Sequence, residues 1–203
     1  MKLYDALRAP SPRRVRIYLA EKGIEVPKVM VDLAAFEEKS ESFRALNVLQ
    51  RVPVLELDDG TTIAETMAIC RYFEALHPEP NLFGVDALEI AQVEMWNRRI
   101  ELGIYTSVQA VFRHGHPGMA KYEVPQVPQW AEVNKPRVEE FLQIMDAELA
   151  KHEFIAGNRY TVADITGLVA MDFMRAGKLS LGEQYRNVRR WYAALAARPS
   201  AKV

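Results

Sequence analysis

Two helix starts and one strand start carry residues that could hold a peptide ligand. Ser11-Pro12 combines a hydroxyl N-cap with a proline in the first helical turn, where the missing N–H costs nothing. Unpaired N–H groups at that helix start could stabilise a thiolate and lower the pKa of a thiol from about 8.5. Ordinary helix capping explains the same dipeptide, so the residues alone leave both interpretations open.

Glu65-Thr66 opens the second of these helices. The positive end of a helix attracts a carboxylate, the threonine hydroxyl adds a donor, and the glutamate can accept from an ammonium group. These groups could hold the zwitterionic end of an amino acid, although capping again accounts for them.

Val52-Pro53 opens a predicted strand. A cis bond here would turn the N–H and C=O of Val52 outward, where an extended peptide could pair with them. A trans proline at a strand start is the commoner arrangement.

The first eighty residues alternate between strand and helix patterns. Gly23 ends the first helix as a C′ residue, and Asp59-Gly60 is expected to form a two-residue hairpin turn. The predicted strands are 2–5, 26–33, 52–57 and 61–64, and the predicted helices are 12–22, 41–46 and 65–77.

This β-α-β-α-β-β-α order restricts the topology. Two strands that flank a helix form a parallel, right-handed unit, whereas two strands joined by a tight turn are antiparallel. The expected fold class is therefore an α/β, thioredoxin-like N-terminal domain with a mixed four-stranded sheet, over residues 1–77.

The rest of the chain shows no strand pattern. Residues 78–86 contain Pro78, Pro80 and Gly84 and are expected to form a linker to an all-helical domain, 87–203. The helical patterns in that domain cover 87–113, 129–151, 162–175 and 184–197.

Composition excludes several classes of protein. The 203 residues carry a net charge of −1, and 49% are apolar, which argues against disorder and against a polybasic nucleic-acid-binding chain. No stretch approaches the ~20 apolar residues of a membrane span, and the first residues lack the pattern of a secretory signal. Cys70 is the only cysteine, so no internal disulfide forms. We therefore expect a cytoplasmic protein with no nucleic-acid and no membrane partner.

Four ordered segments together resemble the cytosolic glutathione S-transferases, in particular those of fungal and bacterial type. They are SPRRVRIYLAEKG at 11–23, RVPVLELDDG at 51–60, IAETMAI at 63–69 and FIAGNRYTVADI at 154–165. Trp191-Tyr192 resembles the closing helix of that family, so the resemblance covers essentially the whole chain.

The resemblance implies a glutathione site in the first domain. Val52, before a cis Pro53, would pair with the cysteinyl backbone of glutathione, and Glu65 and Thr66 would bind its γ-glutamyl end. The glycyl carboxylate would be contacted by Lys39, Gln50 and Arg51. The loop at 47–50 departs from the family's Asn-Pro-x-Gly, so its path stays open.

The group that activates the thiol does not follow from the resemblance. The catalytic serine or cysteine of the family would fall at Ala9, which has neither a hydroxyl nor a thiol. We expect the helix start itself to supply most of the thiolate stabilisation, with Ser11 as the best single side chain. Tyr4, near the position used by tyrosine-type members, is the alternative.

An electrophile pocket is implied between the two domains. Tyr105, Gln109, Phe112 and Arg113 share one face of the first long helix of the second domain and are expected to contact the second substrate. Core packing is the alternative for Phe112. Thr161 and Asp164 form a capping box, so we expect Asp164 to be structural.

Other reactive residue types are expected to have no catalytic role. His114 and His116 are too few for a zinc site, and we expect no metal. Cys70 lies on the apolar face of its helix and is expected to be a core residue rather than a nucleophile.

The leading interpretation is an enzyme that activates glutathione as a thiolate and conjugates it to a small hydrophobic electrophile. It would need no cofactor, since glutathione is a co-substrate. One alternative is a non-catalytic glutathione-binding or protein-interaction module, and another is disulfide reduction, which the lack of a cysteine at the helix start disfavours. Because the family is dimeric, the resemblance also implies a homodimer.

Overall fold

The computed structural model describes all residues, 1–203. The chain forms two compact units, Met1–Asn81 with Lys202–Val203, and Leu82–Ala201. No helix in either unit combines the length and the apolarity needed to cross a membrane.

The first unit contains a four-stranded sheet in the order β2-β1-β3-β4. β1 pairs with β2 in parallel and with β3 in antiparallel register, and β3 pairs with β4 in antiparallel register. The mixed sheet and its thioredoxin-like topology are therefore confirmed. The elements are β1 (Lys2–Asp5), α1 (Pro10–Lys22), β2 (Lys28–Met30), η1 (Leu33–Ala35), η2 (Glu37–Lys39), α2 (Glu41–Leu46), β3 (Val54–Glu56), β4 (Thr62–Ala64) and α3 (Thr66–Leu76).

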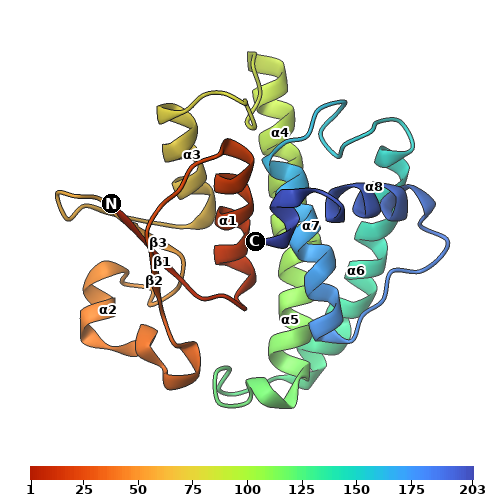
Figure 1. Ribbon diagram of the computed structural model, residues 1–203. Helices are drawn as coiled ribbons and strands as arrows, with labels where there is room; N and C mark the ends of the chain where they lie inside the picture. Colours follow the sequence, from red (N-terminus) through yellow and green to blue (C-terminus); the bar gives the residue numbers. More distant parts are fainter. The chain divides into compact units, whose positions relative to one another are not determined.

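The two faces of the sheet are covered by different helices (Figure 1). α1 and α3 pack side by side on one face, where Leu3 and Leu55 are fully buried. Tyr4, the next residue along β1, turns to the other face, and its ring packs edge-on against Phe43 of α2, with 5.9 Å between centroids. The period-two alternation of strand residues thus separates an apolar face from one that also holds polar side chains.

Three details of the sheet differ from the prediction. β2 covers only Lys28–Met30 of the predicted strand 26–33, and Leu33 already belongs to η1, whose first amides are capped by the Asp32 side chain. β3 begins at Val54 rather than at residue 52, because Pro53 has no N–H to donate to a ladder. The hairpin loop holds three residues rather than two, since the Leu57 amide donates to the Thr61 carbonyl at 2.8 Å. Gly60 adopts φ 86° at the end of that loop, which suits a three-residue hairpin.

The second unit is entirely helical, as predicted. A continuous helix is made of α4, a π-helical turn (η3) and α5, and it packs against α6 and α7. The capping box at the start of α7 is confirmed. The elements are α4 (Ala87–Ile100), η3 (Glu101–Tyr105), α5 (Thr106–Gly115), η4 (Pro117–Met119), α6 (Pro128–Leu149), α7 (Val162–Met174), η5 (Arg175–Gly177), α8 (Arg186–Ala196) and η6 (Pro199–Lys202).

The buried carboxylate of Asp164 accepts hydrogen bonds from several segments of the second unit. Its Oδ1 accepts from the Ile155 amide at 3.0 Å and from Trp191 Nε1 at 2.8 Å, and its Oδ2 accepts from the Thr161 amide at 2.9 Å. The Trp191 ring lies against Gly167, where an added Cβ would fall 2.6 Å from the ring. The carboxylate therefore joins the loop before α7, α7 itself and α8, which is a structural role.

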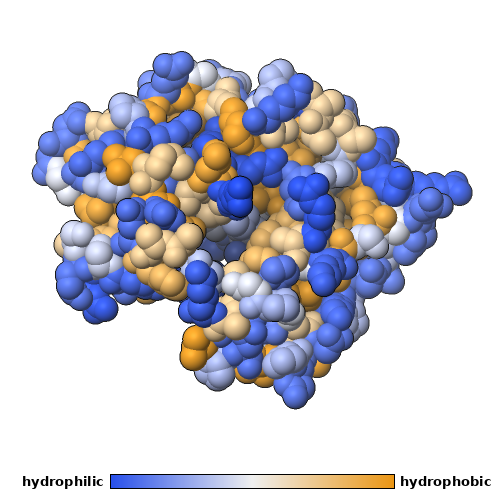
Figure 2. Space-filling view, turned by 60° about the horizontal axis from the view of Figure 1, so that its bottom comes forward, coloured by the Kyte–Doolittle hydropathy of each residue, from blue (hydrophilic) through white to orange (hydrophobic).

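Hydrophilic and hydrophobic residues are mixed over the face of the molecule shown in Figure 2. The hydrophobic side chains on this face lie in small groups among hydrophilic ones.

Candidate functional site

α1 begins two residues earlier than predicted. Its N-cap is Ala9, which is extended and makes no side-chain cap, so the expectation that Ser11 is the N-cap is wrong. Pro10 takes the first helical position, for which its fixed φ is suited. Because Pro10 and Pro12 have no N–H, Ser11 carries the only amide donor among the first three residues of the helix. The first three residues of α1 therefore contain one amide N–H and one hydroxyl, both from Ser11.

Val52 presents an open stretch of backbone. The Val52-Pro53 bond is cis. Pairing between β3 and β4 begins at Val54, and neither the N–H nor the C=O of Val52 has a hydrogen-bond partner in the protein. This residue can therefore pair with the backbone of an extended peptide.

The start of α3 lies next to the start of α1. Thr66 is buried, and its hydroxyl donates to the Ser11 carbonyl at 3.3 Å. The structure thus brings together two of the residues predicted for the site. The backbone amides of Thr66 and Met67 lie in the first turn, which has no side-chain cap, so they remain available to a carboxylate.

Glu65 has a strained backbone. Its φ of 70° is rare for a residue other than glycine, and its carboxylate is exposed and has no partner within the protein. Such strain costs on the order of 1–3 kcal/mol and is typically found where a side chain must be aimed at a ligand. Glu65 therefore offers an exposed anion directly beside the free amides of α3.

The three cationic or amide residues predicted at the glycyl end lie on two loops. The side chains of Lys39 and Arg51 are exposed and have no partner within the protein, and Gln50 has φ 50°. Sequence reasoning missed the residue that sets the loop path, Asn47. Its Nδ2 donates to the Arg51 carbonyl at 2.8 Å, and its Oδ1 accepts from the Leu49 amide at 3.0 Å. An asparagine after a short helix was the available signal for such a turn.

The Tyr4 hydroxyl is already hydrogen-bonded within the protein. Its hydroxyl donates to Glu56 Oε2 at 2.8 Å, on the face of the sheet that α2 covers. Burial and the Glu56 carboxylate both raise the pKa of Tyr4. A phenol held in this way is not placed to share a ligand with Ser11 on α1.

The residues predicted for the electrophile form an aromatic group in the second unit. The Phe112 ring lies 5.2 Å from Phe173 and 5.2 Å from His116, and the Tyr105 ring lies 6.3 Å from Phe173. Tyr105 is almost fully buried, whereas Gln109 and Phe112 are half-buried. Sequence reasoning missed Phe173, a single aromatic residue in the aliphatic helix α7.

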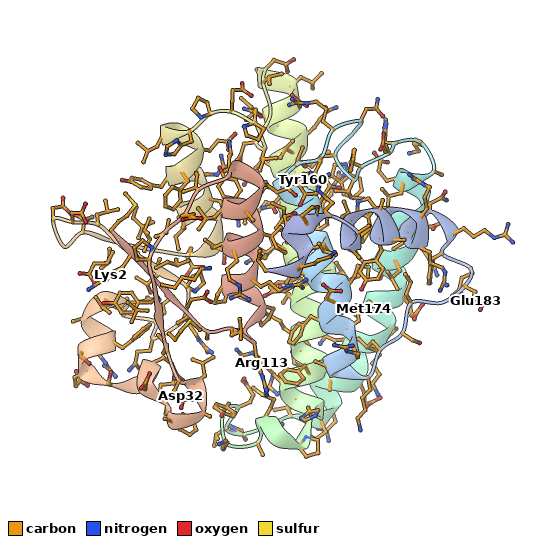
Figure 3. The ribbon with its side chains drawn as sticks, in the orientation of Figure 1. Lys2, Asp32, Arg113, Tyr160, Met174 and Glu183 are labelled. Carbon is orange, nitrogen blue, oxygen red and sulfur yellow. The ribbon has the colours of Figure 1, made fainter.

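Arg113 lies near the end of α5 (Figure 3). Its Nη1 donates to Glu123 Oε2 at 2.9 Å, and its carbonyl accepts from Gln126 Nε2 at 2.7 Å. The two histidines cap backbone amides, since His114 Nδ1 accepts from Val127 and His116 Nδ1 accepts from Gly118. The end of α5 is thus bound to the segment that follows it.

Cys70 is fully buried, and burial raises the pKa of its thiol to about 12. The thiol is therefore protonated at neutral pH, in keeping with the predicted core role rather than a nucleophilic one.

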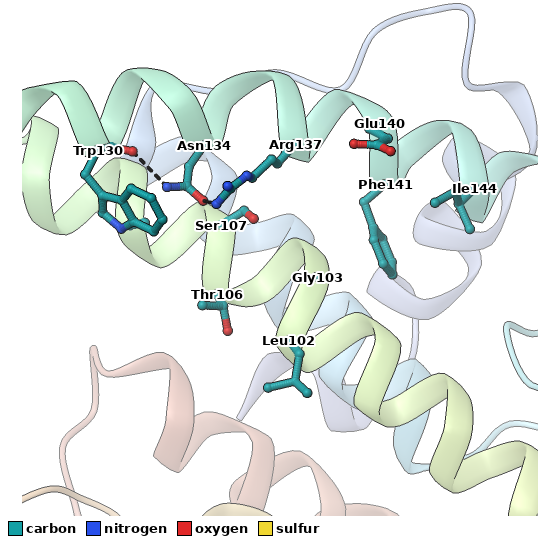
Figure 4. Close-up of a pocket in the computed structure, with 11 residues that line it drawn as sticks. Leu102, Gly103, Thr106, Ser107, Trp130, Asn134, Arg137, Glu140, Phe141 and Ile144 are labelled. Atoms are coloured by element: carbon teal, nitrogen blue, oxygen red, sulfur yellow. Dashed lines mark hydrogen bonds between the residues drawn. The ribbon is translucent and has the colours of Figure 1, made fainter.

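The second unit also contains a pocket of about 370 Å³ between α6 and the junction of η3 and α5 (Figure 4). The buried Asn134 donates to the Trp130 carbonyl at 2.8 Å, and the Arg137 guanidinium lies 5.0 Å from the centre of the Trp130 ring. None of the four residues predicted to contact the electrophile lines this pocket.

Comparisons with known proteins agree across both units. Residues 1–75 match the family model "Glutathione S-transferase, N-terminal domain", and residues 109–199 match "Glutathione S-transferase, C-terminal domain". The chain is 37% identical to "Glutathione S-transferase 2" of Saccharomyces cerevisiae over 205 residues, which cover all of this chain and 88% of that protein.

Two solved bacterial structures are also similar. A glutathione S-transferase domain-containing protein of Marinobacter aquaeolei VT8 has a TM-score of 0.95 and 40% identity, covering 98% of this chain and 99% of that one. A glutathione S-transferase of class Gtt2 from Vibrio parahaemolyticus has a TM-score of 0.87 and 39% identity, covering 98% and 94%.

These matches span the whole chain, so the resemblance carried by the four segments is confirmed, and the enzymatic interpretation holds over that of a binding module. The chain belongs to the glutathione S-transferase family, and it is a glutathione S-transferase enzyme.

Proposed function

We propose that this transferase holds glutathione on its first unit in an extended conformation. The observation that carries the proposal is the free backbone of Val52 beside the uncapped start of α3. The cysteinyl backbone pairs with Val52, and the γ-glutamyl carboxylate accepts from the amides of Thr66 and Met67. The Glu65 carboxylate accepts from the γ-glutamyl ammonium, and Lys39, Gln50 and Arg51 contact the glycyl carboxylate.

Ser11 is proposed to stabilise the thiolate. Since Pro10 and Pro12 remove two amides from the first turn of α1, the stabilisation comes from the Ser11 hydroxyl and amide, together with the helix dipole. A helix dipole contributes ~0.3–2 kcal/mol, which corresponds to at most about 1.5 pK units.

Ser11→Ala is expected to raise the pKa of the bound thiol, because it removes the one hydroxyl at this helix start. The thiolate absorbance of bound glutathione, followed against pH, measures that pKa. Tyr4→Phe is the matched control and is expected to leave it unchanged, since the phenol is bonded to Glu56. A shift in Tyr4→Phe alone would reject the assignment of Ser11.

The electrophile is proposed to bind on the second unit, against Tyr105, Gln109, Phe112 and Arg113. An aromatic group suits a hydrophobic, planar acceptor, because aromatic rings stack favourably at the separations seen here. With both substrates bound, catalysis rests on thiolate formation and proximity. A cytoplasmic location is also proposed, in keeping with a single, buried cysteine.

A homodimer is proposed from exposed apolar side chains on both units. Val48 and Leu49 protrude from the loop before Pro53, with 81% and 63% of their surfaces exposed. Leu102, Trp130 and Ile144 are exposed around the pocket of the second unit. Apolar groups of this kind are typical of surfaces covered by a partner, here a second copy of the chain.

Light scattering at micromolar concentration is expected to give twice the 23.1 kDa mass of one chain. Leu102→Glu places a charge in the apolar surface and is expected to shift the population toward the single-chain mass. A wild-type protein that scatters as one chain would reject the dimer.

A further inference from the structure

The guanidinium of Arg113 is held along one edge only. Glu123 accepts from Nη1 at 2.9 Å, while Nε and Nη2 have no partner within the protein. The side chain is 31% exposed. A planar fork of N–H donors is therefore left free to meet a second oxyanion.

Glu123 is itself fixed in place. Its amide donates to the Met119 carbonyl at 2.9 Å, and its Oε1 lies 3.8 Å from His114 Nε2. Gln126 Nε2 bonds to the Arg113 and His116 carbonyls, which ties the same segment to the end of α5. The orientation of the guanidinium is thus set before any ligand arrives, which reduces the side-chain entropy lost on binding.

Arg113 lies on the same face of the helix as the aromatic group. At 100° per residue, Tyr105, Gln109, Phe112 and Arg113 fall within one stripe about 100° wide, with Phe112 at one edge, Arg113 at the other, and Tyr105 and Gln109 between them. The ring of Phe112 faces Phe173 and His116. A planar ring placed against Phe112 and extending across this face would direct a substituent at its far end toward the edge that carries Arg113.

We propose that Arg113 selects electrophiles that carry a carboxylate on a planar, aromatic framework. The inference rests on the proposed binding of the electrophile by this face of α5. Arginine binds carboxylates through two parallel N–H···O bonds, and the free Nε–Nη2 edge supplies that pair. Glu123 braces the guanidinium and offsets part of its charge.

A matched pair of acceptors tests this selection: para-carboxylated chlorodinitrobenzene and its neutral carboxamide. In both reactions the glutathione thiolate forms a C–S bond at the chlorine-bearing carbon, and chloride leaves with the electron pair of the C–Cl bond. The thiol proton goes to solvent. The measured quantity is the ratio of kcat/KM for the carboxylate to kcat/KM for the carboxamide.

Arg113→Gln and Glu123→Gln both break the ion pair, yet they should change this ratio in opposite directions. Arg113→Gln is expected to lower the ratio about tenfold or more, because a charge-assisted pair of bonds is lost. Glu123→Gln is expected to raise it several-fold, since the glutamine oxygen still accepts from Nη1 while the repelling charge is gone. Arg186→Gln, an exposed arginine of α8 without a partner, is the control and should leave the ratio unchanged.

Equal changes of the kcat/KM ratio in Arg113→Gln and Glu123→Gln would show that the ion pair only holds the segment after α5 in place. That result would overturn the proposal. An unchanged ratio in Arg113→Gln, with Phe112→Ala lowering kcat/KM for both acceptors, would overturn the role of Arg113 but keep the proposed pocket. If Phe112→Ala changed neither acceptor, the proposed electrophile site itself would fall.

Discussion

Asp164→Ala is expected to lower the free energy of unfolding by about 4 kcal/mol or more, because it leaves four buried donors without this acceptor at ~1–3 kcal/mol each. The donors are the amides of Ile155 and Thr161, the Thr161 hydroxyl and the indole N–H of Trp191. Chemical denaturation at fixed protein concentration measures the change. Glu153→Ala removes an exposed glutamate without a partner and is the matched control.

The same carboxyl predicts a dependence of stability on pH. Complete burial raises the pKa of Asp164 from 3.8 to about 6, despite its donors. A raised pKa means that the folded state retains the proton more strongly than the unfolded state does. The contribution of Asp164 to stability is therefore greatest below pH 4 and falls as the pH rises to about 6, by up to ~1.4 kcal/mol per pH unit.

The side chain of the Asp164→Asn variant does not titrate, so its stability should lack this pH dependence. The difference in the free energy of unfolding between wild type and variant should therefore narrow as the pH rises from 4 to about 6. A difference that stays constant from pH 4 to 7 would contradict the raised pKa. If neither Asp164→Ala nor Asp164→Asn changed the unfolding midpoint, the carboxylate would not have the structural role assigned to it.

Glu65→Ala is expected to weaken glutathione binding by one to two orders of magnitude while the fold survives. The carboxylate is exposed and makes no contact within the protein, so its removal leaves no buried group unpaired. A charge-assisted hydrogen bond to the ligand ammonium is worth about 1.5–3 kcal/mol, which gives that range of affinity.

Calorimetric titration with glutathione measures the loss, and the thermal unfolding midpoint checks the fold. Glu25→Ala removes another exposed, unpartnered glutamate of the first unit and should bind glutathione like the wild type. Equal affinity in Glu65→Ala and Glu25→Ala would remove Glu65 from the site.

Local signals in the sequence predicted the elements well where they were unambiguous. Lys2–Asp5, the short helix Glu41–Leu46 and the αL residue Gly23 all lie where the pattern placed them. The start of α1 was ambiguous because Pro10 and Pro12 both suit a first turn. The helix begins at Pro10, so Ser11 lies within the first turn rather than at the N-cap. A hydroxyl followed by proline therefore does not identify an N-cap when a second proline precedes it.

Contacts between residues far apart in the chain could not be predicted from spacing. The partner of Tyr4 is Glu56, and the partner of Phe112 is Phe173. Both pairs depend on which face of a strand or helix meets another element, and periodicity gives the face but not the neighbour. The same holds for Arg113, whose orientation depends on Glu123 in the following segment.

Glutathione is proposed to lie along Val52 and the start of α3. Amide NMR of isotopically labelled protein, titrated with glutathione, distinguishes this position from one on the second unit. The Val52 and Met67 amides are expected to show the largest shifts and to saturate together, because both donate to the ligand, while Val29 on the edge strand β2 stays unmoved. Unshifted Val52 and Met67 amides at saturating glutathione, with the largest changes in the second unit, would contradict it.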